Sequence, residues 1–371
     1  MTRRTPAHAR DRRETIPPLV AVAAFVLVLV FSTWIGLKAA SVPARSADGP
    51  GALGETSAQG DLQSEEGTLR TCTAIFEGPG SPVSPVELHE GELHPDLPIP
   101  KRSGYVFAGW YESPEAAQTL DVSQRVNMAR MVDCQTPRKL TSGWVTPEEN
   151  LAEATEVPIL MYHYVTTYPG QAQEKERPNL YVEPEDLEEQ VAYIRDTGFY
   201  LPSWKELSAF IDGELYLPQR SVVITADDGH KTWWEIAVPI LEEHEVMSTA
   251  FLVTSRDVGP QGFPYVLRRS HTSSLHSTDG GEGPRMLRWS EQEIKGDLET
   301  SAAELGGLAE VLAYPYGQTN DTAKAAAAAA GYEMGRLAAE GYVRIGTEKF
   351  SLPMIQVRNG ESAQELAERI G

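Results

Sequence analysis

The sequence predicts an α/β protein, in which helices cover a parallel β-sheet. Three observations point to this class. Hydrophobic residues make up 41% of the 371 residues, which is enough for a folded core and excludes wholesale disorder. Between Val157 and Val357, apolar runs of strand length alternate with segments of helical spacing. Acidic residues and histidines follow several of these runs directly. We expect a barrel or a doubly wound sheet, because both are built from this alternation.

The bounds of the elements follow from the spacing of apolar residues and from capping residues. In the segment 184–197, Leu187, Val191 and Ile194 fall on one helical face. Asn320 or Asp321 caps an alanine-rich helix that ends near Ala330. The predicted helices are 184–197, 233–244, 289–308 and 321–330. The predicted strands are 157–162, 221–226, 249–254, 311–314, 332–337 and 354–357.

The N-terminal 68 residues predict a membrane-anchored protein. Residues 19–37 are an uncharged apolar run, and about 20 helical residues cross a hydrocarbon core of about 30 Å. Five arginines lie within residues 1–18, so this segment is expected in the cytoplasm and the remainder outside. A cleaved signal peptide is the alternative, although the apolar run is longer than such segments usually are. Residues 38–68 are rich in Ser, Gly, Ala, Pro and acids, and predict a flexible linker.

Residues 69–135 predict a small β-rich module that contains the only two cysteines, Cys72 and Cys134. In an exported protein these two are disulfide candidates, with two free buried thiols as the alternative. The phrase PIPKRSGYVFAGWY at 98–111 resembles the Listeria–Bacteroides repeat, an internalin B-type, β-grasp-like module of bacterial surface proteins. The resemblance implies a spacer or adhesion unit. Residues 136–156 predict a second linker before a large domain at 157–371.

The charge and the cysteine content exclude several classes of protein. The formal net charge is −21 and the pI is near 4.8, so nucleic acid is not an expected partner, because phosphate backbones bind basic surfaces. Two cysteines are too few for a disulfide-dense miniprotein or for a four-cysteine zinc site.

Polar residues after the predicted strands form a candidate metal site. Asp227 and Asp228 follow the strand 221–226, where two carboxylates are costly without partners. His271 and His276 are five residues apart, so they can converge at a strand end but not on one helical face. Taken separately, the aspartates are as typical of a capped turn, and the histidines of an exposed loop. Taken together, one aspartate and two histidines make a three-ligand site with open positions, which is typical of catalysis.

The segment YPYG at 314–317 follows a further strand and is a candidate oxyanion site. Pro315 has no N–H to donate, whereas the amide of Tyr316 can stabilise a developing negative charge. On its own, this segment is as typical of a turn.

These motifs resemble those of NodB-type polysaccharide deacetylases, carbohydrate esterase family four. The family phrases T-F-D-D-G, S-H-T-x-x-x-H and A-Y-P-Y-G correspond to 225–229, 270–276 and 313–317. The histidine spacing and the opening VPILMYHYV are most similar to the poly-N-acetylglucosamine deacetylase branch. The resemblance spans about residues 157–360 and implies a deformed (β/α) barrel.

The resemblance also implies a metal and its ligands. A divalent metal would be held by Asp228, His271 and His276, with Asp227 as the general base and the Tyr316 amide in the oxyanion hole. Zinc is the first expectation, with cobalt, nickel or iron as alternatives.

The proton donor and the substrate contacts are predicted on separate grounds. Many family members use a late histidine as the acid, but no histidine follows His276. The resemblance to the poly-N-acetylglucosamine deacetylase branch implies an early histidine instead, here His163 at the end of the first strand, with a packing histidine that bonds backbone as the alternative. The candidate substrate contacts are Pro315, Tyr316 and Trp233.

The leading functional hypothesis is a metal-dependent hydrolase that removes N-acetyl groups, a linear amide hydrolysis, from an extracellular polysaccharide containing N-acetylglucosamine. Three departures from the family motivate a second hypothesis, a degenerate glycan-binding or scaffold protein. Ala226 replaces the usual Phe, Met354 stands where Arg is common, and the late histidine is missing. An O-acetyl polysaccharide esterase is a third. The expected location of the large domain is the cell exterior, tethered to the membrane or secreted if the N-terminal segment is cleaved.

Overall fold

Seven parallel strands form the centre of the large domain in this computed structural model, which describes residues 70–134, 138–167, 178–281 and 283–371. The strands pair in the closed order β10-β11-β12-β13-β14-β6-β9, and β9 pairs with β10. Their bounds are β6 Ile159–Tyr162, β9 Val223–Ala226, β10 Ser248–Leu252, β11 Val266–Ser270, β12 Val311–Ala313, β13 Met334–Glu340 and β14 Leu352–Gln356. The predicted α/β class is therefore confirmed, and so is a strand at each place where the sequence predicts one in this domain.

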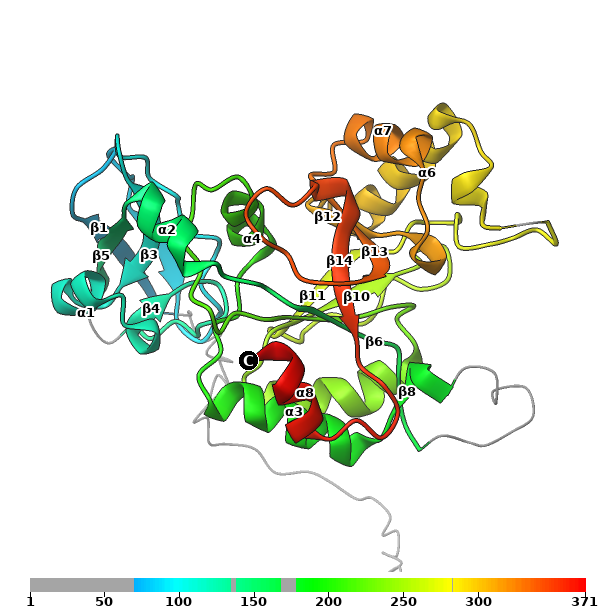
Figure 1. Cartoon of the computed structure of the whole chain (residues 1–371), viewed down its shortest axis with the longest axis horizontal. Helices are drawn as coiled ribbons and strands as arrows, with labels where there is room; N and C mark the ends of the chain where they lie inside the picture. Colours follow the sequence, from blue (N-terminus) through cyan, green and yellow to red (C-terminus); the bar gives the residue numbers. More distant parts are fainter. Residues whose placement is uncertain (1–69, 135–137, 168–177, 282) are drawn as a thin grey trace, which may run out of the picture. The chain divides into compact units, whose positions relative to one another are not determined.

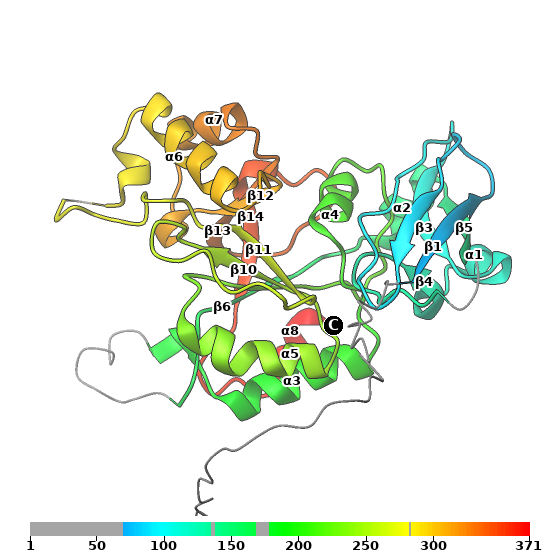
Figure 2. The same cartoon turned by 180° about the vertical axis from the view of Figure 1, so that it is seen from behind.

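Helices cover these strands in two groups. The first group is α3 (Pro184–Asp196), α5 (Val238–Glu243) and α8 (Ala363–Ile370), which lie side by side in Figure 1 and Figure 2. The second group is α6 (Glu291–Glu304) and α7 (Asp321–Ala329), which pack against each other. A buried stripe makes each contact, as on α3, where Leu187, Val191 and Ile194 are buried as the spacing predicts.

One helix closes the end of the ring at which the strands begin. The buried residues of α4 (Trp204–Ile211) share one hydrophobic cluster with the first residues of five strands. These are Ile159, Val223, Val311, Met334 and Leu352. The carboxyl ends of the strands lie at the opposite end, which is where ligands bind in such folds.

The small module is a five-stranded sheet in the order β2-β1-β5-β3-β4. Its elements are β1 Thr71–Glu77, β2 Val86–His89, β3 Val106–Tyr111, α1 Pro114–Thr119, β4 Arg125–Val126 and β5 Arg138–Val145. The predicted disulfide is confirmed, since Cys72 and Cys134 are bonded with their Cα atoms 5.4 Å apart. The resemblance to a bacterial repeat stays a prediction.

The segment 136–156, predicted as a linker, differs from that expectation. It holds β5, which pairs with both β1 and β3 in the middle of the sheet, and α2 (Pro147–Glu153), which begins with a capping box at Thr146. The sequence RKLTSGWV does not show the apolar alternation of a strand, because two of its four buried positions are Ser142 and Gly143.

The predicted helix at 289–308 is shorter than expected. The Ser290 side chain accepts from the Glu293 amide in a capping box, which sets the start of α6 at Glu291. At the other end, Gly306 and Gly307 both have φ +84°, which a helix cannot continue through.

Short elements complete the fold. Two-residue strands β7 (Tyr164–Val165) and β8 (Tyr181–Val182) pair with each other. A π-helical turn at Trp233–Ala237 precedes α5. 3-10 turns lie at Val122–Gln124, Pro178–Leu180, Arg285–Leu287, Pro315–Gly317 and Lys349–Ser351.

The predicted cytoplasmic segment 1–18, membrane anchor 19–37 and linker 38–68 lie outside the described residues. Within the described ranges after residue 69, none of the helices has the length and apolarity needed to span a bilayer.

Candidate metal centre

Three strand ends bring the predicted site residues together. Asp227 and Asp228 follow β9, His271 follows β11, and the turn that holds Tyr316 follows β12. Backbone bonds fix two of these ends, since the Asp227 amide donates to Tyr162 O (3.0 Å) and the His271 amide to Leu252 O (2.8 Å). The prediction that these residues converge is confirmed by their positions.

The backbone is sharply bent at each of the three strand ends. Asp228, Thr272 and Tyr316 have φ of +70°, +69° and +56°, in the left-handed region that non-glycine residues seldom adopt. Close packing explains the glycines that follow two of them: a Cβ on Gly317 would lie 2.0 Å from Ala338, and one on Gly229 2.5 Å from Leu252. Such bends gather at functional sites.

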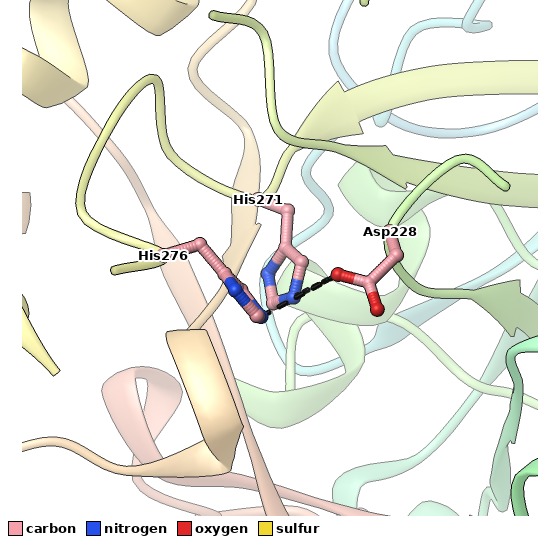
Figure 3. Close-up of side chains that lie close together, drawn as sticks. All are labelled: Asp228, His271 and His276. Atoms are coloured by element: carbon pink, nitrogen blue, oxygen red, sulfur yellow. Dashed lines mark ion pairs between the residues drawn. The ribbon is translucent and has the colours of Figure 1, made fainter. Parts of the chain in front are cut away.

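Asp228, His271 and His276 form a three-ligand cluster (Figure 3). Their candidate ligand atoms all lie within 4.8 Å of one another. The Asp228 carboxylate oxygen Oδ1 is 3.4 Å from His276 Nε2 and 3.8 Å from His271 Nε2. His271 Nδ1 is 2.8 Å from the carbonyl of Ala313, and since a carbonyl only accepts, Nδ1 carries a proton. Nε2, which faces Asp228, is therefore the ring nitrogen available to a metal.

These donors fit a divalent cation. Asp228 Oδ1 is buried and has no hydrogen-bond partner among the described residues, although it faces two ring nitrogens. Burial and then the His271 ring lower the pKa of His276 to about 4, while Asp228 raises it, so the ring is neutral near pH 7. A carboxylate and two neutral imidazoles are the ligands of many zinc and iron sites. Open positions would remain on the side of the cavity.

Asp227 lies beside this cluster but has a different partner. It is buried and forms an ion pair with Arg336 of β13, itself only 1% exposed. Burial is the largest single influence and raises the pKa of Asp227. The attraction of Arg336, His271 and His163 and the hydrogen bond from Arg336 together outweigh burial, so the pKa is lowered to about 2. Asp227 is therefore ionised and held in one orientation.

Arg336 is the residue that sequence reasoning missed. The expected arginine position is occupied by Met354, which is buried on β14. Arg336 comes from the neighbouring strand β13, which pairs with β14. One signal was present in the sequence: a single arginine stands inside the strand MGRLA, where a buried charge needs a partner.

A cavity of about 350 Å³ opens over the cluster. Six predicted site residues line it: His163, Asp227, Asp228, His271, His276 and Tyr316. The structure adds Asn179 and Gln356, whose side-chain amide Nε2 donates to Asn179 O (3.1 Å). The pKa of His163 is lowered by burial, because the opposing attraction of the Asp227 and Asp228 carboxylates only partly offsets the loss of solvation.

Tyr316 lies with its ring over His276. The ring centroids are 4.4 Å apart with 30° between the planes, and 43% of Tyr316 remains exposed to the cavity side and solvent. The amides of Gly317 and Gln318 donate within the turn, to Tyr314 O and Pro315 O. Neither of these bonds uses the amide of Tyr316.

Two predicted substrate contacts are wrong. Trp233 is fully buried with its ring packed 6.1 Å from that of Tyr162, so it cannot reach a sugar. Pro315 is also buried and does not line the cavity.

Comparison with known proteins places part of the large domain in one family. Residues 215–335 match the family Polysaccharide deacetylase, a span that includes both aspartates, both histidines and Tyr316. The chain contains a polysaccharide deacetylase domain. This confirms the predicted enzyme class, a hydrolase that acts on amide bonds.

Individual relatives are distant. The chain is 22% identical over 240 residues to the "Putative polysaccharide deacetylase YxkH" of Bacillus subtilis, covering 63% of this chain and 81% of the relative. It is 25% identical over 206 residues to the "Poly-beta-1,6-N-acetyl-D-glucosamine N-deacetylase" of Staphylococcus epidermidis, covering 50% and 71%. The structure of the Streptococcus pyogenes deacetylase PplD with acetate superposes with a TM-score of 0.51 at 22% identity, covering 59% and 99%, and supports the fold.

Proposed function

We propose that this protein is a metal-dependent N-deacetylase of an extracellular polysaccharide that contains N-acetylglucosamine. The observation that carries the proposal is the convergence of Asp228, His271 and His276 in one cavity, next to a separate, ionised carboxylate. A non-catalytic scaffold has little use for this arrangement, because buried polar groups without partners destabilise the fold.

The metal would be held by Asp228, His271 and His276, with zinc proposed first because of the ligand set. When bound, a divalent ion polarises the acetyl carbonyl and makes water more acidic.

Each remaining group has a role that its surroundings support. Asp227 stays ionised next to Arg336, so it can accept the proton of the attacking water as a general base. The Tyr316 amide is proposed to donate to the oxyanion that forms on the acetyl oxygen. His163, on the wall of the same cavity, is proposed to return a proton to the leaving sugar amine.

The proposed substrate is a poly-N-acetylglucosamine-like polymer or a cell-wall glycan. The names of the staphylococcal relatives support the first of these. We further propose that the domain acts outside the cell, anchored through residues 19–37 or secreted after cleavage, on the strength of the apolar run and the arginines before it.

The test is release of acetate from poly-N-acetylglucosamine, peptidoglycan and acetylxylan by the full chain with added Zn²⁺ or Co²⁺. We expect release from an N-acetylated glucan, and Asp227→Asn should abolish it while bound metal is retained. Release from acetylxylan alone would identify an O-acetyl esterase instead. Bound metal without acetate release from any polymer would support the scaffold hypothesis and reject the proposal.

A further inference from the structure

The loop that carries the two histidines is held by a residue outside the proposed catalytic set. Asp297, in the middle of α6, accepts three hydrogen bonds from this loop. The amide of Ser273 donates to Oδ1 (2.8 Å), and both the amide and the hydroxyl of Ser274 donate to Oδ2 (2.8 and 2.6 Å). Hydrogen bonds to a charged acceptor are stronger than neutral ones, so these three bonds hold the loop firmly against α6.

The helix that supplies Asp297 is itself fixed to the sheet. Ile294 and Leu298 are fully buried in a cluster with Leu312 of β12. The Ser301 hydroxyl is 2.8 Å from that of Ser270, the residue directly before His271. Asp297 therefore ties the loop to α6, a helix whose own position is fixed by the sheet.

The positions of the two histidines depend to different degrees on the hydrogen bonds to Asp297. His271 is held by its own bonds, from its amide to Leu252 O and from Nδ1 to Ala313 O. The Nδ1 atom of His276 is buried and has no hydrogen-bond partner among the described residues. The ring of His276 is placed by contacts with the rings of His271 (4.7 Å) and Tyr316 (4.4 Å) and by the path of its loop, where the His276 carbonyl accepts from Arg256 Nη2 (3.2 Å).

We propose that Asp297 is a positioning residue for the metal centre, which sets the loop 272–275 so that His276 Nε2 meets Asp228 and His271. This inference rests on the proposed function, because it concerns the ligands of the proposed metal. Groups that orient metal ligands affect metal affinity by about 10- to 100-fold when removed.

Binding of Zn²⁺ to the metal-free full chain, measured by calorimetry, tests this directly. Asp297→Ala should raise the dissociation constant by about 10- to 100-fold, and Asp297→Asn, which keeps one acceptor oxygen, by less. Ser274→Ala removes the shortest of the three bonds without changing the charge, and should weaken binding by a few-fold. Thermal unfolding of the metal-free variants shows whether each is folded. If Asp297→Ala does not fold, the Asn and Ser274 variants decide.

The matched control is Glu304→Gln on the same helix. Glu304 carries the same charge near the same loop but accepts only a long 3.5 Å bond from the Ser273 hydroxyl. Its affinity for Zn²⁺ should stay within about twofold of the wild type. Equal weakening by Glu304→Gln and Asp297→Ala would mean that charge alone matters, and would overturn the inference, as would wild-type affinity in Asp297→Ala. Absence of Zn²⁺ binding by the wild type would instead reject the proposed function.

Discussion

Replacing Arg336 by methionine tests the electrostatic basis of the proposed mechanism. Methionine is an unbranched apolar side chain without charge, so the variant leaves the buried Asp227 carboxylate without its counter-ion. Burial is the largest influence on this group, and it then raises the pKa above the ordinary value of 3.8 instead of leaving it at about 2. In the variant, Asp227 should therefore be protonated over a pH range in which the wild-type carboxylate is ionised.

The magnitude follows from the change in pKa. Lowering the pKa of Asp227 from 3.8 to about 2 corresponds to about 2.5 kcal/mol at 1.36 kcal/mol per pH unit. Because the folded-state pKa is the lower one, this stabilisation is present above pH 4 and disappears as the pH falls towards 2. Arg336→Met should therefore lower the free energy of unfolding at pH 7 by about 2–5 kcal/mol, the upper end being typical of breaking a buried pair.

The activity assay is the pH profile of kcat/KM for acetate release. At pH 7 we expect a loss of about 100-fold, the lower range for a general base, with partial recovery as the pH rises and Asp227 ionises again. Arg336→Lys keeps a charge but not the planar fork, and should fall between the wild type and the methionine variant.

The control is Arg269→Met, which breaks another ion pair of a buried strand arginine, with Glu310. It should lower thermal stability without moving the pH profile. If Arg336→Met kept both the wild-type kcat/KM and the wild-type profile, the assignment of Arg336 as the group that keeps Asp227 ionised would be rejected.

Three further outcomes are expected. Removing metal from the wild type with a chelator should lower Tm by about 5–10 °C relative to protein with Zn²⁺ at 100 times Kd, and Zn²⁺ should restore it; an unchanged Tm would argue against a metal in the folded state. Tyr316→Ala should weaken Zn²⁺ binding by about 2- to 10-fold in calorimetry, because the ring stacked on His276 is lost, whereas Tyr316→Phe should not. Replacing both Cys72 and Cys134 by serine should destabilise the small module by about 4 kcal/mol in denaturant unfolding, given their separation of 62 residues; loss of acetate release in a still-folded variant would contradict a purely structural role.

The metal site was predictable because its polar residues come directly after predicted or neighbouring strands in the sequence. An apolar run followed at once by Asp227 and Asp228 marks the carboxyl end of a buried strand, and parallel strands bring such ends to one side. The bond from His271 Nδ1 to Ala313 O was not predictable, because it joins residues 42 apart and depends on which strands are neighbours.

Arg336 and Trp233 show two other limits of sequence reasoning. The register between β13 and β14 is irregular. Residue spacing in the sequence therefore could not show that Arg336, and not residue 354, supplies the arginine next to Asp227. The π-helical turn at Trp233–Ala237 changes the direction of successive side chains, and a regular helical period therefore cannot tell whether Trp233 or Trp234 faces the interior.

The contacts of the small module bear on its role. Arg125 of β4 donates to Tyr216 O (3.0 Å) and Asn127 to Leu201 O (2.8 Å), while the Tyr216 amide donates to Phe107 O (2.8 Å). Both partner segments, at 200–201 and 215–217, precede β9 and flank α4, so they lie where the strands begin. The metal cluster lies where the strands end. A module attached at the first end cannot supply a wall of the cavity, so its aromatic residues are better explained as its own core, in which Phe107 contacts both Trp110 and Trp144, than as part of the substrate site.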